Sequence, residues 1–166
     1  MRAMEAARAG RPVGVRRVSL AVGVLAAAAL AVAWTLQYGF GLEPCQLCLW
    51  ERWPYIAVVL LAFGGLLLGR PRAAMALAAL VLLAGAGLSV YHVGVEQGVF
   101  ALPEGCVAVG QAATIEELRQ QLMQARPTCD QVTASFLALS LAAWNGLFSV
   151  ALAALAGFGA LARPSS

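Results

Sequence analysis

Four apolar runs constrain this chain more than any other feature. They cover about residues 18–40, 46–69, 73–95 and 132–161. A helix needs about 20 residues to cross the hydrocarbon core of a bilayer, and each run is long enough. Only 11% of the residues are charged, whereas a soluble domain keeps roughly a quarter charged. We therefore predict an all-α membrane protein in which residues 1–166 form a single domain, an up-down bundle of four transmembrane helices in a lipid bilayer.

The arginines predict how the bundle is oriented. The two termini and the turn between the second and third runs lie on one side, and they carry eight arginines: Arg2, Arg8, Arg11, Arg16, Arg17, Arg70, Arg72 and Arg163. The other side, with loops at about 41–46 and 96–131, carries Arg52, Arg119 and Arg126. An arginine excess marks the cytoplasmic side, so we expect cytoplasmic termini. The basic residues are dispersed along the chain, so the +3 net charge does not indicate nucleic-acid binding.

The second run opens on the nine residues Pro44-Cys45-Gln46-Leu47-Cys48-Leu49-Trp50-Glu51-Arg52. If this stretch is helical, Cys48 and Arg52 lie one turn apart on the same face. A cation and a helix N-terminus both favour a reactive thiolate. A Cys45–Cys48 disulfide would close a very short loop and stabilise the fold little, so the pair suits thiol exchange. The alternative for Arg52 is an interfacial arginine that pairs with lipid phosphate or with Glu51.

The two remaining cysteines, Cys106 and Cys129, lie in the second loop on the same side of the membrane. The predicted topology puts all four cysteines outside the cytoplasm, where disulfides persist. A Cys106–Cys129 disulfide could be purely structural. The spacing and the lack of nearby histidines argue against zinc, and Leu49 stands where a c-type haem site needs histidine, so we expect no metal site.

The second loop also contains a helix signal. Thr114-Ile115-Glu116-Glu117 is a capping box, and Pro127 follows the apolar-periodic stretch. We predict a short amphipathic helix over about 114–125. It could lie on the membrane surface, or it could pack on the bundle or on a partner protein.

The sequence resembles the disulfide bond formation protein B (DsbB) family of bacterial membrane oxidases. The resemblance covers nearly the whole chain, and the Pro-Cys-x-x-Cys-x-x-x-Arg motif in a four-helix membrane protein is highly specific. The matching residues are Pro44-Cys45-x-Leu47-Cys48-x-x-Glu51-Arg52, Tyr91-His92, the Cys106/Cys129 loop with Asp130, Phe136-Leu137-Ala138-Leu139-Ser140, and Trp144-Asn145.

The resemblance implies a function in the bacterial inner membrane, with the cysteine loops in the periplasm. A soluble DsbA-like oxidase with a thioredoxin fold would give its electrons to a Cys106–Cys129 disulfide. From there they would pass to the Cys45–Cys48 pair and on to a membrane quinone, ubiquinone or menaquinone. Such electron transport supports disulfide formation during protein folding, a chaperone-type role. The resemblance also implies that Arg52 holds the quinone near Cys48, and that His92 donates a hydrogen bond to a quinone carbonyl. The alternative for His92 is an interfacial hydrogen-bonding residue.

Two rival functions remain open from the sequence. One is a non-enzymatic membrane scaffold with structural disulfides. The other is a relay of the vitamin K epoxide reductase type, although in that family the Cys-x-x-Cys motif lies within a later span. Polar residues within or near the spans, Gln37 and Asn145, are expected to bridge helices.

Overall fold

The computed structural model describes residues 13–103, 105–106, 114–124 and 127–162. Most of the basic N-terminal segment, Arg126 and Arg163 therefore lie outside the described residues. Within them, four helical stretches are long and apolar enough to cross a membrane, which confirms the predicted fold class. These stretches are α2 (Val13–Trp34) with the π-helix η1 (Thr35–Gly39), α3 (Gln46–Trp50) with α4 (Arg52–Leu67), α5 (Pro71–Glu96), and α7 (Leu141–Leu161).

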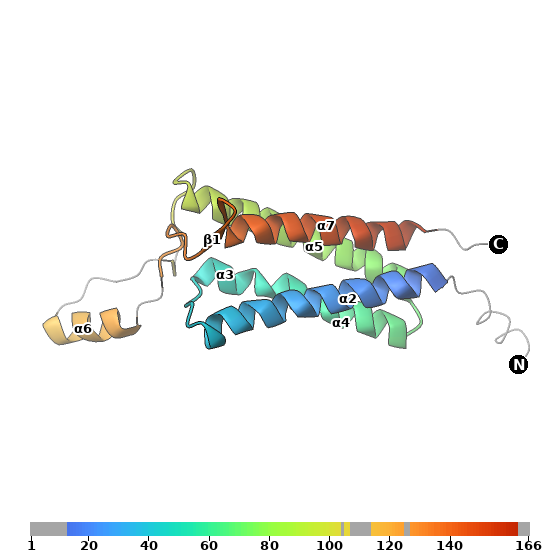
Figure 1. Cartoon of the computed structure of the whole chain (residues 1–166), viewed down its shortest axis with the longest axis horizontal. Coiled ribbons are helices and arrows are strands. Elements are labelled where there is room, and N and C mark those ends of the chain that lie inside the picture. Colours follow the sequence, from blue (N-terminus) through green and yellow to red (C-terminus); the bar gives the residue numbers. More distant parts are fainter. Residues whose placement is uncertain (1–12, 104, 107–113, 125–126, 163–166) are drawn as a thin grey trace, which may run out of the picture.

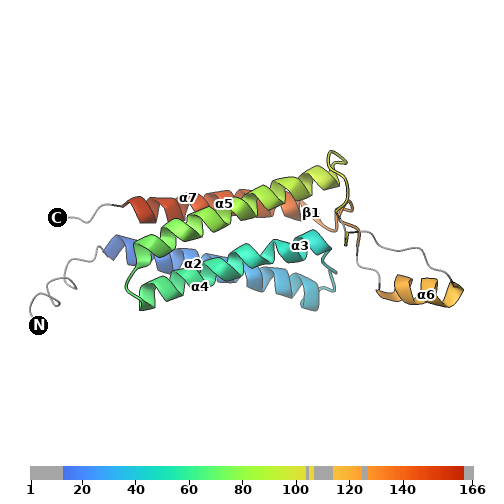
Figure 2. The ribbon, with the colours of Figure 1, turned by 180° about the vertical axis from the view of Figure 1, so that it is seen from behind.

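The four stretches lie side by side as an up-down bundle (Figure 1). In both ribbon views α5 runs along α7, and α2 runs along α4 (Figures 1 and 2). Helix α2 begins and helix α7 ends at one end of the bundle, and the cysteines lie at the other end. The cysteine-bearing segments therefore gather on one side, as the topology predicted from the sequence requires.

The second stretch is interrupted where the dithiol motif ends. Helix α3 ends at Trp50, Glu51 forms a turn, and α4 begins at Arg52. Pro54 explains the break, because proline has no N–H to donate to the carbonyl of Trp50 four residues earlier. The irregularity therefore lies at Glu51, three residues before this proline. The break points the Glu51 side chain into the bundle, where 7% of its surface is exposed.

The fourth helix begins at Leu141, later than the expected start near Val132. Ser135–Phe136 (β1) and Leu139–Ser140 (β2) form a two-stranded antiparallel hairpin just before it. Ser140 then caps the helix, because its hydroxyl oxygen accepts a hydrogen bond from the Ala143 N–H at 3.2 Å. The tight hairpin and this cap place Trp144 and Asn145 in the first turns of α7.

Helices α4 and α5 pack closely against each other, including near the turn that joins them. A Cβ atom on Gly65 would overlap with the Cβ of Ala74. Farther along, a Cβ on Gly85 would lie 3.0 Å from Cβ of Pro54. Small residues permit such close backbone contact between membrane helices. This packing fixes the distance between the break at Glu51 and the facing residues of α5.

The short helix predicted in the second loop is present as α6 (Ile115–Gln124). The capping box is formed, since the Glu117 N–H donates to the Thr114 hydroxyl at 3.1 Å. Helix α6 stands away from the bundle in both ribbon views (Figures 1 and 2). Ile115, on the apolar face of α6, is 87% exposed. In this structure α6 therefore does not bury this face against the bundle.

Candidate functional site

The Cys45–Cys48 dithiol forms the start of α3. Pro44 leads into an extended Cys45, which is the N-cap residue of the helix, and its sulfur accepts a hydrogen bond from the Cys48 N–H at 3.2 Å. The two sulfur atoms lie 2.9 Å apart. The pKa of the Cys45 thiol is lowered, chiefly because the Cys48 thiol donates a hydrogen bond to its sulfur. Burial opposes this shift, and hydrogen bonds from His92 and from the Cys48 backbone add to it.

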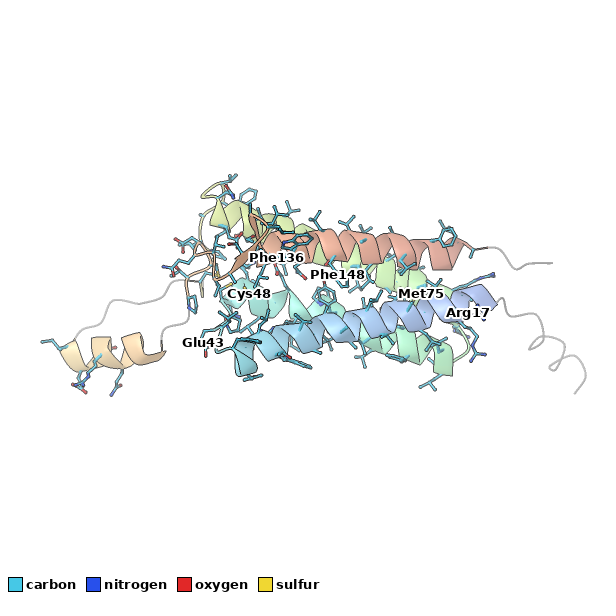
Figure 3. All side chains as sticks on the ribbon, viewed as in Figure 1. Arg17, Glu43, Cys48, Met75, Phe136 and Phe148 are labelled. Carbon is cyan, nitrogen blue, oxygen red and sulfur yellow. A yellow bond between two sulfur atoms is a disulfide. The ribbon has the colours of Figure 1, made fainter. Side chains whose placement is uncertain are left out.

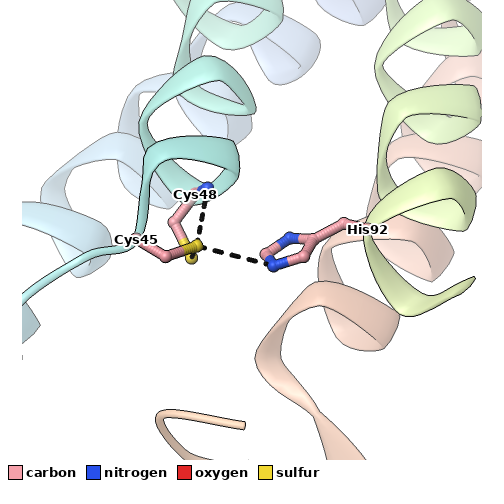
Figure 4. A group of neighbouring side chains, drawn as sticks. All are labelled: Cys45, Cys48 and His92. Atoms are coloured by element: carbon pink, nitrogen blue, oxygen red, sulfur yellow. Dashed lines mark hydrogen bonds between the residues drawn. The ribbon is translucent and has the colours of Figure 1, made fainter. Parts of the chain in front are cut away.

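His92 projects from α5 toward this pair (Figure 4). Its Nε2 atom lies 3.5 Å from the Cys45 sulfur, and the side chain is 2% exposed. Its other ring nitrogen, Nδ1, lies 3.0 Å from Oε1 of Glu51. With Glu51 ionised, Nδ1 is the donor in that hydrogen bond. The imidazole therefore connects a thiol to a buried carboxylate.

Glu51 is held at both oxygens. While Oε1 faces His92, Oε2 accepts a hydrogen bond of 3.0 Å from the side-chain amide of Asn145 in α7. That amide also donates to the Ser89 hydroxyl of α5 at 2.9 Å. The Tyr55 hydroxyl of α4 donates to Oδ1 of Asn145 at 2.7 Å. A buried polar network thus ties three helices together beside the dithiol.

Cys106 and Cys129 form a disulfide, with Cα atoms 5.3 Å apart. This bond and Cys45 belong to one cluster of buried residues, together with Leu47 and Val95. Cys48 packs against the same cluster. The structure therefore brings the two cysteine pairs together, although they are far apart in the sequence.

On its other side, Cys48 faces a cleft between α2, α4 and α7. The cleft has a volume of about 540 Å³ and is mostly apolar. Leu25 and Val32, which line it, are 39% and 59% exposed on the outside of the bundle, so the cleft reaches the surface that would face lipid. The labelled side chains of Cys48 and Phe148 mark part of its length (Figure 3). Its polar end is lined by Glu43, Cys48, Glu51, Arg52, Tyr55 and Asn145.

Arg52 lines the cleft but makes a different contact from those expected. Its Nη1 donates to Oε1 of Gln37 in η1 at 2.7 Å. This bond joins α4 to the end of the first helix, so Gln37 bridges helices as expected, and Asn145 does the same at α7. The carboxylate of Glu51, the other expected partner of Arg52, pairs with His92.

The described residues include one group that could hold a metal ion, formed by Cys45, Cys48 and His92, whose ligand atoms lie within 4.8 Å of one another. Two Zn–S bonds of about 2.3 Å at a tetrahedral angle would hold the sulfurs roughly 3.8 Å apart. The observed 2.9 Å is shorter than this. The arrangement suits a dithiol that closes to a disulfide better than a metal site.

Comparison with known proteins agrees with this geometry. The family described as "Disulfide bond formation protein DsbB" matches residues 15–159. The chain belongs to the DsbB family. Disulfide bond formation protein B 2 of Pseudomonas putida is 34% identical over 151 residues, which cover 87% of this chain and 89% of that protein. An uncharacterized protein of Rickettsia prowazekii is 26% identical over 129 residues, covering 75% of each chain. The search of solved structures gave no significant match.

Membership of the DsbB family makes this a multi-pass membrane protein with a role in disulfide bond formation. Within that frame, the structure brings Cys45, Cys48 and His92 together, and it joins Cys106 to Cys129. Among the described residues that line the cleft are Cys48 and Arg52, but not His92. His92 lies beside Cys45 and Glu51, and its hydrogen bond to a quinone carbonyl stays a prediction.

Sequence reasoning did not assign a functional role to Glu51, Tyr55 or Ser89. The sequence did contain a signal for them. In otherwise apolar helices, pairs of polar residues occur three or four positions apart. The pairs are Glu51/Tyr55, Ser89/His92 and Asn145/Ser149. Polar residues at such spacings share a helix face. An ionisable residue inside a membrane span is by default a candidate for function.

Proposed function

We propose that this protein is a thiol:quinone oxidoreductase of the bacterial inner membrane. It reoxidises a periplasmic, DsbA-like dithiol oxidase through Cys106–Cys129 and Cys45–Cys48, and it passes the electrons to ubiquinone or menaquinone. The observation that carries the proposal is the position of Cys48. Cys48 belongs to the dithiol and also lines an apolar cleft that reaches the lipid-facing surface.

The cleft fits the head group and the first part of the tail of a quinone. Its long apolar part, between α2 and α7, suits an isoprenoid chain, and its polar end suits a ring with two carbonyl oxygens. When bound, a quinone supplies a two-electron acceptor at the edge of the bilayer. Arg52, held by Gln37, would orient one carbonyl with a charge-assisted hydrogen bond.

The two cysteine pairs would act in series. A thiolate of the soluble partner attacks the Cys106–Cys129 disulfide at Cys106, forms a mixed disulfide and releases the Cys129 thiolate. The partner's second thiol then resolves the mixed disulfide, which leaves the partner oxidised and Cys106 and Cys129 reduced. The electrons then pass by thiol–disulfide exchange to Cys45–Cys48, which packs in the same buried cluster. The orientation of the arginines supports a periplasmic location for both pairs.

The lowered pKa of Cys45 supports the direction of electron flow. A soluble oxidase of the DsbA type has a potential near about −120 mV, so its oxidant must itself be strongly oxidising. A stabilised thiolate favours the reduced form of a dithiol and so makes its disulfide a stronger oxidant. The pKa of Cys45 is lowered in this way, and its partner Cys48 lines the cleft in which we place the quinone.

Thiol trapping tests the proposal. The purified protein is mixed with an excess of a reduced DsbA-like protein, with and without a soluble ubiquinone analogue, and free thiols are trapped over time. We expect rapid multiple-turnover oxidation of the partner only with quinone. If added quinone leaves the rate of partner oxidation unchanged, the proposed function is wrong. A scaffold with structural disulfides would behave in that way.

A further inference from the structure

Closing the Cys45–Cys48 disulfide releases two protons from two different places. Cys48 lines the cleft and can give up its proton there. Cys45 is 1% exposed and lies among Leu47, Val95 and the Cys106–Cys129 disulfide. A proton from Cys45 therefore needs carriers to reach the acceptor.

The structure contains one such path. His92 Nε2 lies 3.5 Å from the Cys45 sulfur, and His92 Nδ1 lies 3.0 Å from Oε1 of Glu51. Glu51 is the residue where the path meets the cleft, because it contacts His92 and also lines the cleft beside Cys48. Imidazole and carboxylate are both groups that gain and lose protons readily.

We propose that Glu51 is the proton carrier between the dithiol and the acceptor cleft, with His92 as the intermediate group. This inference rests on the thiol:quinone function proposed above. In the reduced protein His92 holds the Cys45 proton, as an imidazolium facing a thiolate. His92 passes its Nδ1 proton to Oε1 of Glu51, and Glu51 delivers it to the cleft.

The step balances in atoms and charge. The S–S bond between Cys45 and Cys48 forms, and two electrons leave for the quinone. One proton comes from the Cys48 thiol directly, and the other comes from Cys45 through His92 and Glu51. The two electrons and two protons convert the quinone to the quinol. His92 ends neutral and Glu51 returns to its carboxylate form, ready for the next reduction of the dithiol.

Asn145 positions the carrier. Its amide donates to Oε2 of Glu51, which leaves Oε1 for His92. The amide is itself fixed, because the Tyr55 hydroxyl donates to its oxygen at 2.7 Å and its nitrogen donates to Ser89 at 2.9 Å. A carboxylate that is held on both sides keeps one orientation between the imidazole and the cleft.

The test compares wild type with Glu51→Gln, which keeps the shape and the hydrogen bond from Asn145 but cannot carry a proton. In quinone-free reduced protein, thiolate absorbance near 240 nm is followed against pH. The midpoint for Cys45 is expected to rise in the variant, because the imidazolium that faces the thiolate loses its counter-charge. In single turnovers with a soluble ubiquinone analogue, reduction of the quinone is expected to slow by about 100-fold or more.

Glu51→Asp retains a titratable carboxylate and should recover part of the rate. Glu116→Gln, which makes the same charge change on the distant helix α6, is the control and should behave as wild type. Folding of each variant is checked by the rate at which Cys106–Cys129 reacts with the reduced partner, which should not change. If Glu51→Gln reduces quinone at the wild-type rate with an unshifted Cys45 midpoint, Glu51 is not the carrier. If wild type itself fails to reduce quinone, the proposed function is wrong instead.

Discussion

Glu51 and His92 meet at 3.0 Å between two helices, although 41 positions separate them in the sequence. Their pairing depends on two local features. The helix break caused by Pro54 points Glu51 inward, and the close approach of α4 and α5 brings His92 within reach. Both side chains are buried, so each requires the other to satisfy its hydrogen-bonding groups.

Substitution of the loop cysteines tests the order of the relay. Cys106 keeps 3% of its surface exposed and Cys129 keeps 0%, which favours Cys106 as the sulfur that a partner attacks. Neither variant can form the loop disulfide, so the partner is supplied in its oxidised form and its own disulfide is the one exchanged. We expect the Cys106 thiol left in Cys129→Ser to accumulate a stable mixed disulfide, and Cys106→Ser, which keeps only the Cys129 thiol, to capture no partner. Non-reducing gel electrophoresis after acid quenching measures both. Equal yields of mixed disulfide from the two variants would contradict the assignment of Cys106.

Arg52 and Gln37 provide a paired test of the cleft. Arg52→Met removes the cation at the polar end, and we expect the apparent KM for quinone to rise at least tenfold, equivalent to about 1.4 kcal/mol of binding. Gln37→Leu removes the group that holds Arg52 in place, so it should raise KM by a smaller factor. Steady-state assays at several quinone concentrations measure this. An unchanged KM in Arg52→Met would leave Arg52 as a lipid-anchoring residue.

The sequence predicted the fold well because lipid imposes strong rules on it. Every backbone group must be satisfied inside the membrane, so long apolar runs become helices. The capping box likewise predicted α6, since its signal is local. The hairpin before α7 was missed because its sequence, Ser135–Ser140, reads as a continuation of the apolar run. Its turn holds Leu137 and Ala138 at positive φ, an arrangement that residue preferences do not favour.

The site was predicted in part. Cys45, Cys48 and Arg52 could be named from a short motif with known chemistry, and Cys106 and Cys129 from the predicted topology and the family resemblance. The contacts of His92 and Arg52 could not be predicted from the sequence, because they depend on which helices become neighbours and on the break at Glu51. Asn145 was recognised as a residue that bridges helices, but its partner Glu51 follows only from the three-dimensional packing.

Two adjacent glycines in α4 test the close packing of the bundle. Gly65→Ala would place a methyl group against Ala74 of α5 and should destabilise the protein by about 1–3 kcal/mol. Gly64→Ala is the control, because a Cβ there has no atom within 4 Å, and alanine favours a helix by up to about 1 kcal/mol. Thermal unfolding in detergent measures both variants. Equal destabilisation by the two substitutions would contradict the packing of α4 on α5.

The effect of His92 on the dithiol gives a pH-dependent prediction. The pKa of Cys45 is lowered, first by the hydrogen bond from Cys48 and further by His92. The reduced form is therefore favoured at pH values above the lowered pKa, and this advantage is lost as the pH falls through it. His92→Gln should raise the pKa of Cys45 toward the ordinary value of about 8.5. For each unit of that rise below pH 7, the potential of Cys45–Cys48 at pH 7 should fall by about 30 mV, and a rise beyond 7 adds little more. Equilibration with glutathione or dithiothreitol buffers measures the potential, and the difference from wild type should shrink toward acidic pH. A potential that does not change in His92→Gln would show that His92 does not act on the Cys45 sulfur.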